Sequence, residues 1–124
     1  MRRAAVGEAP RPIYVVWEIT LACDLACGHC GSRAGKARSD ELSTAEALDV
    51  VRQLAELGTE EITLIGGEAY LRKDWATLAR AIVDAGMRCG MTTAGRGFGA
   101  HHAAAARDAG VSAISISLDG LRAA

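Results

Sequence analysis

The sequence lacks an apolar run long enough to cross a membrane as a helix, and its first residues include arginines but no apolar core typical of a secretory signal. It also lacks an excess of charge: 14 Lys and Arg stand against 15 Asp and Glu, so nothing favours a nucleic-acid or membrane partner. No Ser-His-Asp arrangement or phosphate-binding loop is recognisable. The 124 residues, half of them apolar, predict at most one globular domain, which we expect in the cytosol.

Proline and cysteine are both scarce. The two prolines fall in residues 1–12, which carry no periodic pattern and are predicted to form a flexible lead-in to a domain over residues 13–124. Three of the four cysteines lie in the short stretch Cys23-Asp-Leu-Ala-Cys27-Gly-His-Cys30. A disulfide framework does not suit this stretch, because such close pairs rarely reach the required geometry and one thiol would be left over. The three cysteines are therefore predicted to be metal ligands.

Two kinds of metal centre fit three thiols in one loop. A structural zinc site needs four protein ligands, so Cys89, His101 or His102 would have to supply the fourth. An iron–sulfur cluster held by three thiolates instead keeps one iron open for a substrate or cofactor, and we favour this interpretation. Cys89 better suits a buried position in a strand. The two histidines are adjacent on a predicted helix and point in different directions, which suits the surface or a helix cap.

Local signals predict four strands that alternate with three helices. The first strand is rich in β-branched and aromatic residues, a capping box of Ser43 and Glu46 begins the first helix, and a glycine ends each helix. The predicted strands cover residues 13–20, 61–65, 88–93 and 111–118, and the predicted helices run from Ser43 to Gly58, from Asp74 to Gly86 and from Ala100 to Ala109. One helix between each pair of strands demands parallel strands and right-handed crossovers. The predicted fold is α/β, a partial barrel of order β-α-β-α-β-α-β.

The distinctive motifs follow the carboxyl ends of the predicted strands, which is the functional end of parallel α/β folds. The cysteine loop follows the first strand, Gly66-Gly67-Glu68 follows the second, and residues 117–120 lie at the carboxyl end of the fourth. Two glycines after a buried strand permit a close approach to a ligand, although the same pair also fits a plain turn. The basic segment 31–40 is interpreted as a solvated connector.

Strand four also points to a ligand cavity. Its alternate residues from Ala113 to Asp119 are small or polar, whereas an ordinary barrel fills its interior with bulky branched side chains. Glu18 in the first strand has two possible positions, in the same cavity or in solvent at its mouth.

Three stretches carry a resemblance to a known family: residues 17–30 with CxxxCxxC, residues 64–75 with Gly-Gly-Glu, and residues 115–120 with Ser-Ile-Ser-Leu-Asp-Gly. Together they resemble the first four strands of the radical S-adenosylmethionine (radical SAM) core, closest to the maturases of peptides and proteins that append a SPASM domain with auxiliary clusters. The resemblance implies a 4Fe-4S cluster and SAM as cofactors. It further implies that an external electron donor drives cleavage of SAM to methionine and a 5′-deoxyadenosyl radical, which takes a hydrogen atom from a peptide or protein substrate.

The resemblance also assigns roles to individual residues. Cys23, Cys27 and Cys30 would hold the cluster, and Gly66, Gly67 and Glu68 would hold the methionine end of SAM. His29 would lie beside the adenine with a backbone contact, and Ser117 would help to bind SAM from the fourth strand. Ala69 stands where the family usually has proline, which removes a rigid turn residue but no polar contact.

The chain departs from the family in length, because the barrel of the family has further βα units after the fourth. We therefore expect a fragment, a truncated product or one half of a split enzyme. The strand at residues 111–118 would then present an open edge to another chain that completes the barrel. The alternative hypothesis is a non-catalytic remnant or metal-binding module in which no competent SAM pocket forms.

Overall fold

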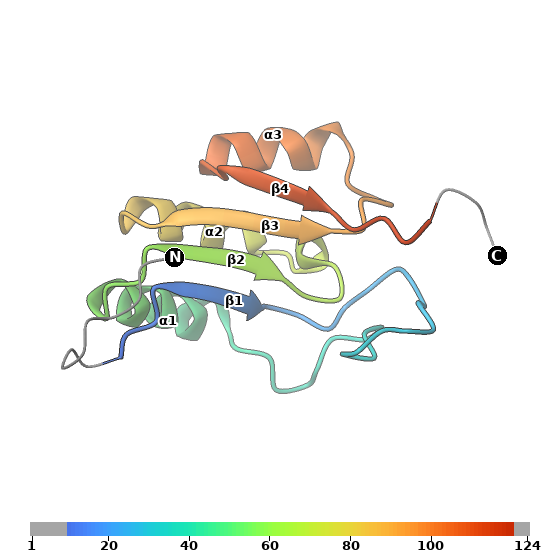
Figure 1. The fold of residues 1–124 in the computed structure, drawn as a ribbon, viewed down its shortest axis with the longest axis horizontal. Coiled ribbons are helices and arrows are strands. Elements are labelled where there is room, and N and C mark those ends of the chain that lie inside the picture. The colour runs from blue at the N-terminus through green and yellow to red at the C-terminus, as the bar shows by residue number, and fades with distance from the viewer. Residues whose placement is uncertain (1–9, 121–124) are drawn as a thin grey trace.

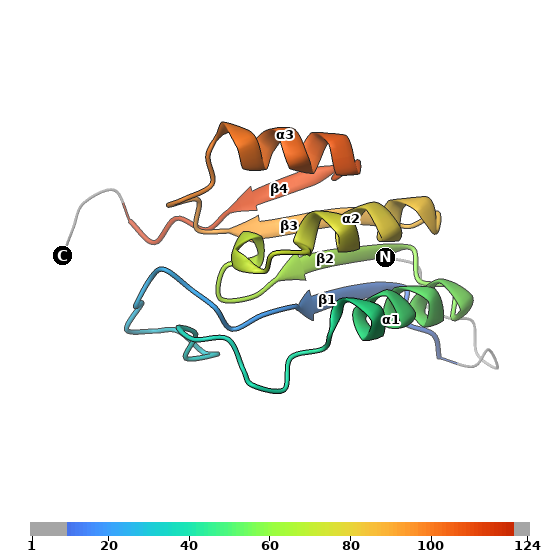
Figure 2. The ribbon, with the colours of Figure 1, turned by 180° about the vertical axis from the view of Figure 1, so that it is seen from behind.

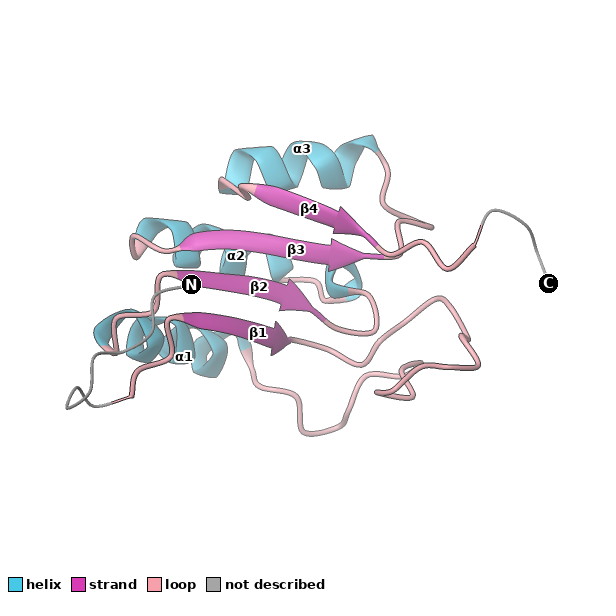
Figure 3. Ribbon diagram, viewed as in Figure 1, coloured by secondary structure: helices cyan, strands magenta, loops and turns pink. Residues whose placement is uncertain are grey.

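Four parallel strands form one sheet in the order β1-β2-β3-β4 in the computed structural model, which describes residues 10–120 (Figure 1). The elements are β1 (Tyr14–Glu18), α1 (Thr44–Glu56), β2 (Glu61–Ile65), the 3-10 helix η1 (Ala69–Leu71), α2 (Trp75–Asp84), β3 (Arg88–Thr93), α3 (Ala100–Ala109) and β4 (Ala113–Ile116). The predicted α/β fold with its alternating order is therefore confirmed (Figure 3). Residues 1–9 of the predicted lead-in and residues 121–124 lie outside the described residues.

The predicted strands at residues 61–65 and 88–93 and the predicted third helix match the structure, whereas the first and fourth strands are shorter than predicted. β4 begins two residues late because the backbone N–H of Val111 bonds to the carbonyl of Ala106 and so closes α3. β1 ends at Glu18, although the N–H of Ile19 still bonds to the carbonyl of Ile65.

The helix boundaries follow the local signals. In the capping box of α1, the N–H of Glu46 donates to Ser43 Oγ (3.3 Å) and the N–H of Ser43 donates to Glu46 Oε2 (2.8 Å). Gly110 ends α3 with a φ of 84°, a left-handed conformation that glycine adopts without strain. Asp74 occupies the N-cap position of α2, but its carboxylate makes no cap hydrogen bond and binds Arg72 and Thr44 instead.

Helices α1 and α2 cover one face of the sheet: they lie behind the strands in Figure 1 and in front of them in Figure 2. The core between these layers contains Ile62 and Leu64 of β2, Leu78 and Ile82 of α2, and Met91 of β3, all of them fully buried. Burial of each such side chain stabilises the fold by about 1.5–3 kcal/mol. None of the helices in the described part of the chain is both long and apolar enough to cross a bilayer.

Cys89 lies in this core, as predicted, with no exposed surface. Burial raises the pKa of its thiol to about 12, so the thiol stays protonated and unreactive at neutral pH.

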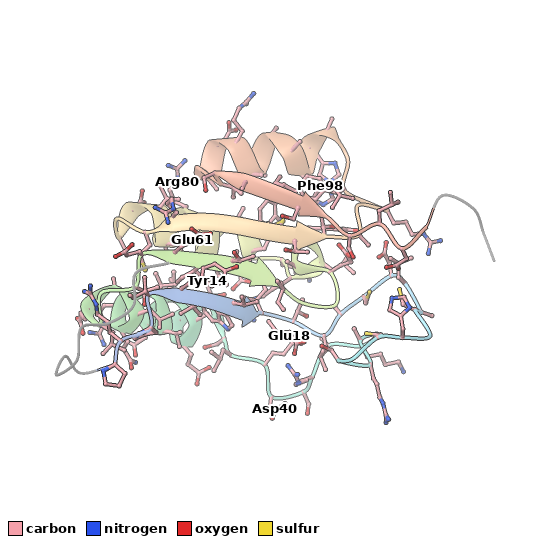
Figure 4. The ribbon with its side chains drawn as sticks, viewed as in Figure 1. Tyr14, Glu18, Asp40, Glu61, Arg80 and Phe98 are labelled. Carbon is pink, nitrogen blue, oxygen red and sulfur yellow. The ribbon has the colours of Figure 1, made fainter. Side chains whose placement is uncertain are left out.

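The opposite face of the sheet is left open by the described residues. Tyr14 and Val16 of β1 are about half exposed on this face, and the Tyr14 hydroxyl donates to Thr63 Oγ1 of β2 (3.0 Å) (Figure 4). Ala113 and Ser115 of β4 pair with Gly90 and Thr92 of β3, so the small residues of β4 continue this open face. The predicted polar cavity of a complete barrel would correspond to this face.

Candidate functional site

The cysteine loop leaves β1 at the carboxyl end of the sheet and extends beyond the strands before it returns to α1 (Figure 1). Its base is closed by a short parallel pairing of Ala22 with Gly35. There the N–H of Cys23 donates to the carbonyl of Gly35 (3.0 Å), and the N–H of Gly35 donates to the carbonyl of Leu21 (2.9 Å). These bonds hold both ends of the segment that contains the three cysteines.

The three thiols of this loop are free. The thiols of Cys23 and Cys30 are partly buried, and each accepts a backbone N–H at 3.4 Å, from Leu25 and Ala34 respectively. Cys27 is exposed. Within residues 10–120 no three His, Cys, Asp or Glu side chains converge to hold a metal ion, so the structure places the three cysteines on one loop without bringing their thiols together.

The surroundings of the loop bear on which metal centre it could hold. A Cβ added at Gly28 or Gly31 would meet no atom within 4 Å, so these two positions beside the cysteines are open. None of the candidate fourth zinc ligands joins the loop. Cys89 is in the core, and among the described residues neither His101 nor His102 forms a three-ligand group with the cysteines. The Nε2 atoms of the two histidines lie 3.1 Å apart on α3, so the prediction that these side chains point in different directions is wrong.

The glycine pair packs directly on the start of the cysteine loop. The N–H of Gly67 donates to the carbonyl of Thr20 (2.9 Å), and the N–H of Glu68 donates to the carbonyl of Ala22 (2.7 Å). A Cβ at Gly66 would stand 2.6 Å from the Thr20 carbonyl oxygen. A Cβ at Gly67 would stand 2.4 Å from the Ala22 carbonyl oxygen and 2.7 Å from the Cβ of Cys23. The close approach that the sequence predicted for a ligand is therefore made, in this structure, by the cysteine loop itself.

Glu68 follows β2 and is buried, with 2% of its surface exposed, and its side chain forms hydrogen bonds at the end of β3. Its carboxylate accepts hydrogen bonds from the Thr93 hydroxyl and from the N–H of Ala94 (2.7 Å) at the carboxyl end of β3. Because both carboxylate oxygens have protein partners, the side chain acts as a fixed link between two strands. The sequence did not indicate this role.

His29 and Ser117 lie toward the carboxyl end of β4. His29 Nε2 is 3.5 Å from Asp119 Oδ1, and both side chains are exposed. The N–H of Ser117 donates to the carbonyl of Thr93 (2.8 Å), one residue after β4, and its side chain is exposed. The cysteine loop thus reaches across the end of the sheet from β1 toward β4.

Glu18 and the connector at residues 31–40 contact each other. Ser32 Oγ donates to Glu18 Oε2 (2.6 Å) and Arg38 Nη2 donates to Glu18 Oε1 (2.7 Å). The hydrogen bonds from Ser32 and Arg38 lower the pKa of Glu18 below its ordinary value. The predicted solvated connector is exposed along nearly all of its length, and two of its polar side chains also bind the end of β1.

Two residues that the sequence analysis missed fasten the return of the loop. Glu41 Oε1 accepts hydrogen bonds from Thr20 Oγ1 (3.1 Å) and from the N–H groups of Leu21 (2.9 Å) and Arg38 (3.0 Å). Arg72 donates to the carbonyls of Ile19 (3.1 Å) and Leu42 (2.8 Å). No local pattern could have revealed these contacts, because most of the partners are 20 or more residues apart.

A pocket of about 190 Å³ lies beside Glu41 and Arg72, on the β1 side of the sheet, where Figure 4 labels Glu18 and Asp40. It is lined by Trp17, Glu18, Ile19, Arg38, Asp40, Glu41, Leu42 and Arg72. The charged groups around it largely satisfy one another, so the pocket does not stand out as a ligand site.

Substitution Glu41→Gln is expected to lower the free energy of unfolding by about 1–2 kcal/mol at neutral pH, since glutamine offers only a neutral acceptor. Burial raises the pKa of Glu41, but the hydrogen bonds from Leu21, Arg38 and Thr20 outweigh it, so the pKa falls below its ordinary value of 4.5. A lowered carboxyl pKa stabilises the fold above that value and ceases to do so as the pH falls through the folded-state pKa. Urea unfolding of both proteins between about pH 7 and pH 3 should therefore show the difference shrinking in acid.

The control is Glu60→Gln, at an exposed glutamate before β2, which should unfold like the parent protein. A Glu41→Gln difference that stays constant down to about pH 3 would contradict the role of the charge.

The model of the family described as "Radical SAM superfamily" matches residues 17–123. The AdoMet-dependent heme synthase of Oleidesulfovibrio alaskensis is 35% identical over 121 residues, which are 97% of this chain and 31% of the relative. The Fe-coproporphyrin III synthase of Methanosarcina barkeri is 37% identical over 109 residues, which are 87% of this chain and 27% of the relative. The mycofactocin maturase MftC of Mycobacterium tuberculosis is 41% identical over 64 residues, which are 52% of this chain and 16% of the relative. The chain thus spans about a third or less of the length of these curated relatives.

Two solved structures share the fold. The crystal structure of BtrN in complex with AdoMet and 2-DOIA superposes with a TM-score of 0.73 at 17% identity, covering 89% of this chain and 47% of that one. The crystal structure of Streptococcus suis SuiB bound to S-adenosylmethionine has a TM-score of 0.67 at 21% identity, covering 77% and 22%. At these identities the likeness shows the arrangement of strands and helices.

Proposed function

The chain belongs to the radical SAM superfamily, and on that premise we propose that Cys23, Cys27 and Cys30 hold a 4Fe-4S cluster with one iron open to SAM. The observation that carries the proposal is the packing of the cysteine loop on Gly66-Gly67 at the carboxyl end of the sheet. This packing brings Cys23, the first of the three cysteines, next to Gly67 in the motif that the resemblance assigns to SAM. The free thiols and the N–H groups directed at two of them support the same assignment.

The residues of the chain would bind and orient the two cofactors. The cysteines would hold the cluster, and the backbone of Gly66, Gly67 and Glu68 would approach the methionine end of SAM. His29 and Ser117, toward the β4 end of the loop, would contact SAM from the other side. When bound, the reduced cluster and SAM would supply one-electron cleavage of SAM to methionine and a 5′-deoxyadenosyl radical, with the electron coming from an external donor. A reducing compartment such as the cytosol suits these free thiols.

We propose a peptide or protein as the substrate, supported by the resemblance to maturases and by the 41% identity to MftC over 64 residues. An iron porphyrin is a second candidate, because the relatives named heme synthase and Fe-coproporphyrin III synthase match over 97% and 87% of the chain. Titration of iron coproporphyrin III into the reconstituted protein discriminates the two. A saturable shift of the porphyrin absorption favours the second candidate, and its absence counts against it.

Anaerobic reconstitution with iron and sulfide, followed by electron paramagnetic resonance (EPR) of the dithionite-reduced protein with and without SAM, tests the proposed cofactors. We expect a reduced 4Fe-4S signal that changes when SAM is added, because SAM would bind the open iron. Formation of 5′-deoxyadenosine would then show cleavage. A cluster that ignores SAM would contradict the proposed SAM site, and a protein without any cluster would favour the remnant or metal-binding module. If SAM binding appears only after addition of a second chain carrying later strands, that chain completes the barrel at the β4 edge.

A further inference from the structure

Tyr70 connects the cysteine loop to the loop between β3 and α3. It lies on η1, two residues after Glu68, and only 6% of its surface is exposed. Its hydroxyl donates to Asp24 Oδ2 (3.3 Å) and accepts from the N–H of Gly97 (3.0 Å). A single phenol oxygen therefore joins three chain segments, one of which begins at Cys23.

The three segments are tightly packed where they meet. A Cβ added at Gly97 would lie 2.8 Å from the Tyr70 hydroxyl oxygen and 3.5 Å from Asp24 Oδ2, so only glycine lets the loop come this near. Arg96 of the same loop donates from Nη1 to the backbone carbonyl of Asp24 (2.8 Å). Asp24 is thus held through both its side chain and its backbone.

The ring of Tyr70 is itself fixed by aromatic neighbours. Phe98 packs edge-on with ring centroids 5.7 Å apart, and the imidazole of His102 lies 4.7 Å away in a tilted arrangement. These contacts restrict the ring to one orientation, so the hydroxyl stays directed at Asp24. Burial, together with the nearby charges of Asp24 and Glu68, raises the pKa of Tyr70 despite the Gly97 hydrogen bond, and the hydroxyl keeps its proton at neutral pH.

We propose that Tyr70 is a positioning residue for the cysteine loop: through Asp24 it holds Cys23 in place relative to the Gly66-Gly67-Glu68 segment that precedes η1. Any effect of Tyr70 on cluster binding rests on the proposed function. Its effect on the position of Cys23 in the metal-free chain is independent of the proposed function.

Substitution Tyr70→Phe tests this role, because it keeps the packed ring and removes both hydrogen bonds. The matched control is Tyr14→Phe, which removes the hydrogen bond to Thr63 on the open face, far along the strand from the cysteine loop. The first measurement is the alkylation rate of Cys23 in the reduced, metal-free protein, followed by mass spectrometry of the Cys23 peptide. Loss of the hydrogen bond to Asp24, which links Tyr70 to the cysteine loop, predicts a rate about fivefold higher in Tyr70→Phe and an unchanged rate in Tyr14→Phe.

A second variant separates positioning from a general loss of structure. Asp24→Ala leaves Tyr70 and its aromatic contacts intact, so it should raise Cys23 alkylation as Tyr70→Phe does. The double variant should show little further increase, because both changes break the same link. Thermal unfolding of each variant checks that the fold persists. Cys23 reactivity equal to that of the parent protein in a folded Tyr70→Phe variant would overturn the proposal.

Reconstitution then connects the two proposals. If Tyr70→Phe binds a cluster with broadened EPR features or reduced iron content, the positioning role extends to the cofactor. If neither the parent protein nor any variant binds a cluster, the proposal of a 4Fe-4S cofactor is wrong. Faster Cys23 alkylation in Tyr70→Phe would still support the positioning role.

Discussion

Replacement of Cys27 by alanine is expected to reduce the iron bound after anaerobic reconstitution from about four atoms per chain to background, and to abolish 5′-deoxyadenosine formation. Two thiolates cannot hold a cluster that also leaves one iron open to SAM. Cys27 suits this test because it is exposed, so alanine there should leave the packing of the fold unchanged. Iron and sulfide analysis, visible absorption and EPR all measure the outcome.

The matched control is Cys89→Ala, which removes a cysteine from the core. Its thiol is kept protonated by burial, which raises the pKa to about 12, so it should contribute no ligand. We expect full iron content and a free energy of unfolding lowered by about 1 kcal/mol. Iron retained in Cys27→Ala, or lost in a folded Cys89→Ala, would contradict the proposed ligand set and revive a site that includes Cys89.

Gly67→Ala is expected to lower the free energy of unfolding by about 3 kcal/mol or to prevent folding of the site. The added methyl group would stand 2.4 Å from the Ala22 carbonyl oxygen and 2.7 Å from the Cβ of Cys23, and neither is the end of a flexible side chain. The cysteine loop would have to move away from β2, which also breaks the hydrogen bond from the N–H of Gly67 to Thr20. Urea unfolding measures the loss, and iron content after reconstitution measures the effect on the site.

Gly31→Ala is the control for this substitution. Gly31 follows Cys30 in the same loop, but a Cβ there would meet no atom within 4 Å, and its φ is not in the left-handed region. We expect its stability to stay within about 0.5 kcal/mol of the parent protein. Equal behaviour of the two alanine variants would show that the loop does not pack on Gly67 in solution.

Much of the fold could be predicted because its signals are local. The capping box of Ser43 and Glu46 begins α1, and Gly110 ends α3, because both satisfy backbone groups within a few residues. The bounds of β2 follow from a short apolar run that ends at Gly66, and those of β3 from a short segment between Gly86 and Gly95. The predicted first and fourth strands were longer than β1 and β4, because the strand ends depend on hydrogen bonds to other segments. For example, the N–H of Val111 bonds to the carbonyl of Ala106 and closes α3, which delays the start of β4.

The candidate site divides in the same way. The sequence by itself determined which motifs the chain carries: three thiols in one short loop, a glycine pair after an apolar strand, and an alternation that demands parallel strands. These are properties of neighbouring residues, and the family match agrees with them.

Only the tertiary structure decided which groups these motifs touch. It places the cysteine loop against Gly66 and Gly67, directs the carboxylate of Glu68 to β3, and joins Asp24 to Tyr70. Such contacts link residues 25 to 46 positions apart, and no periodicity in the sequence encodes them. They exist because parallel strands end at one edge of the sheet, where loops that are distant along the chain must share space and satisfy one another's polar groups.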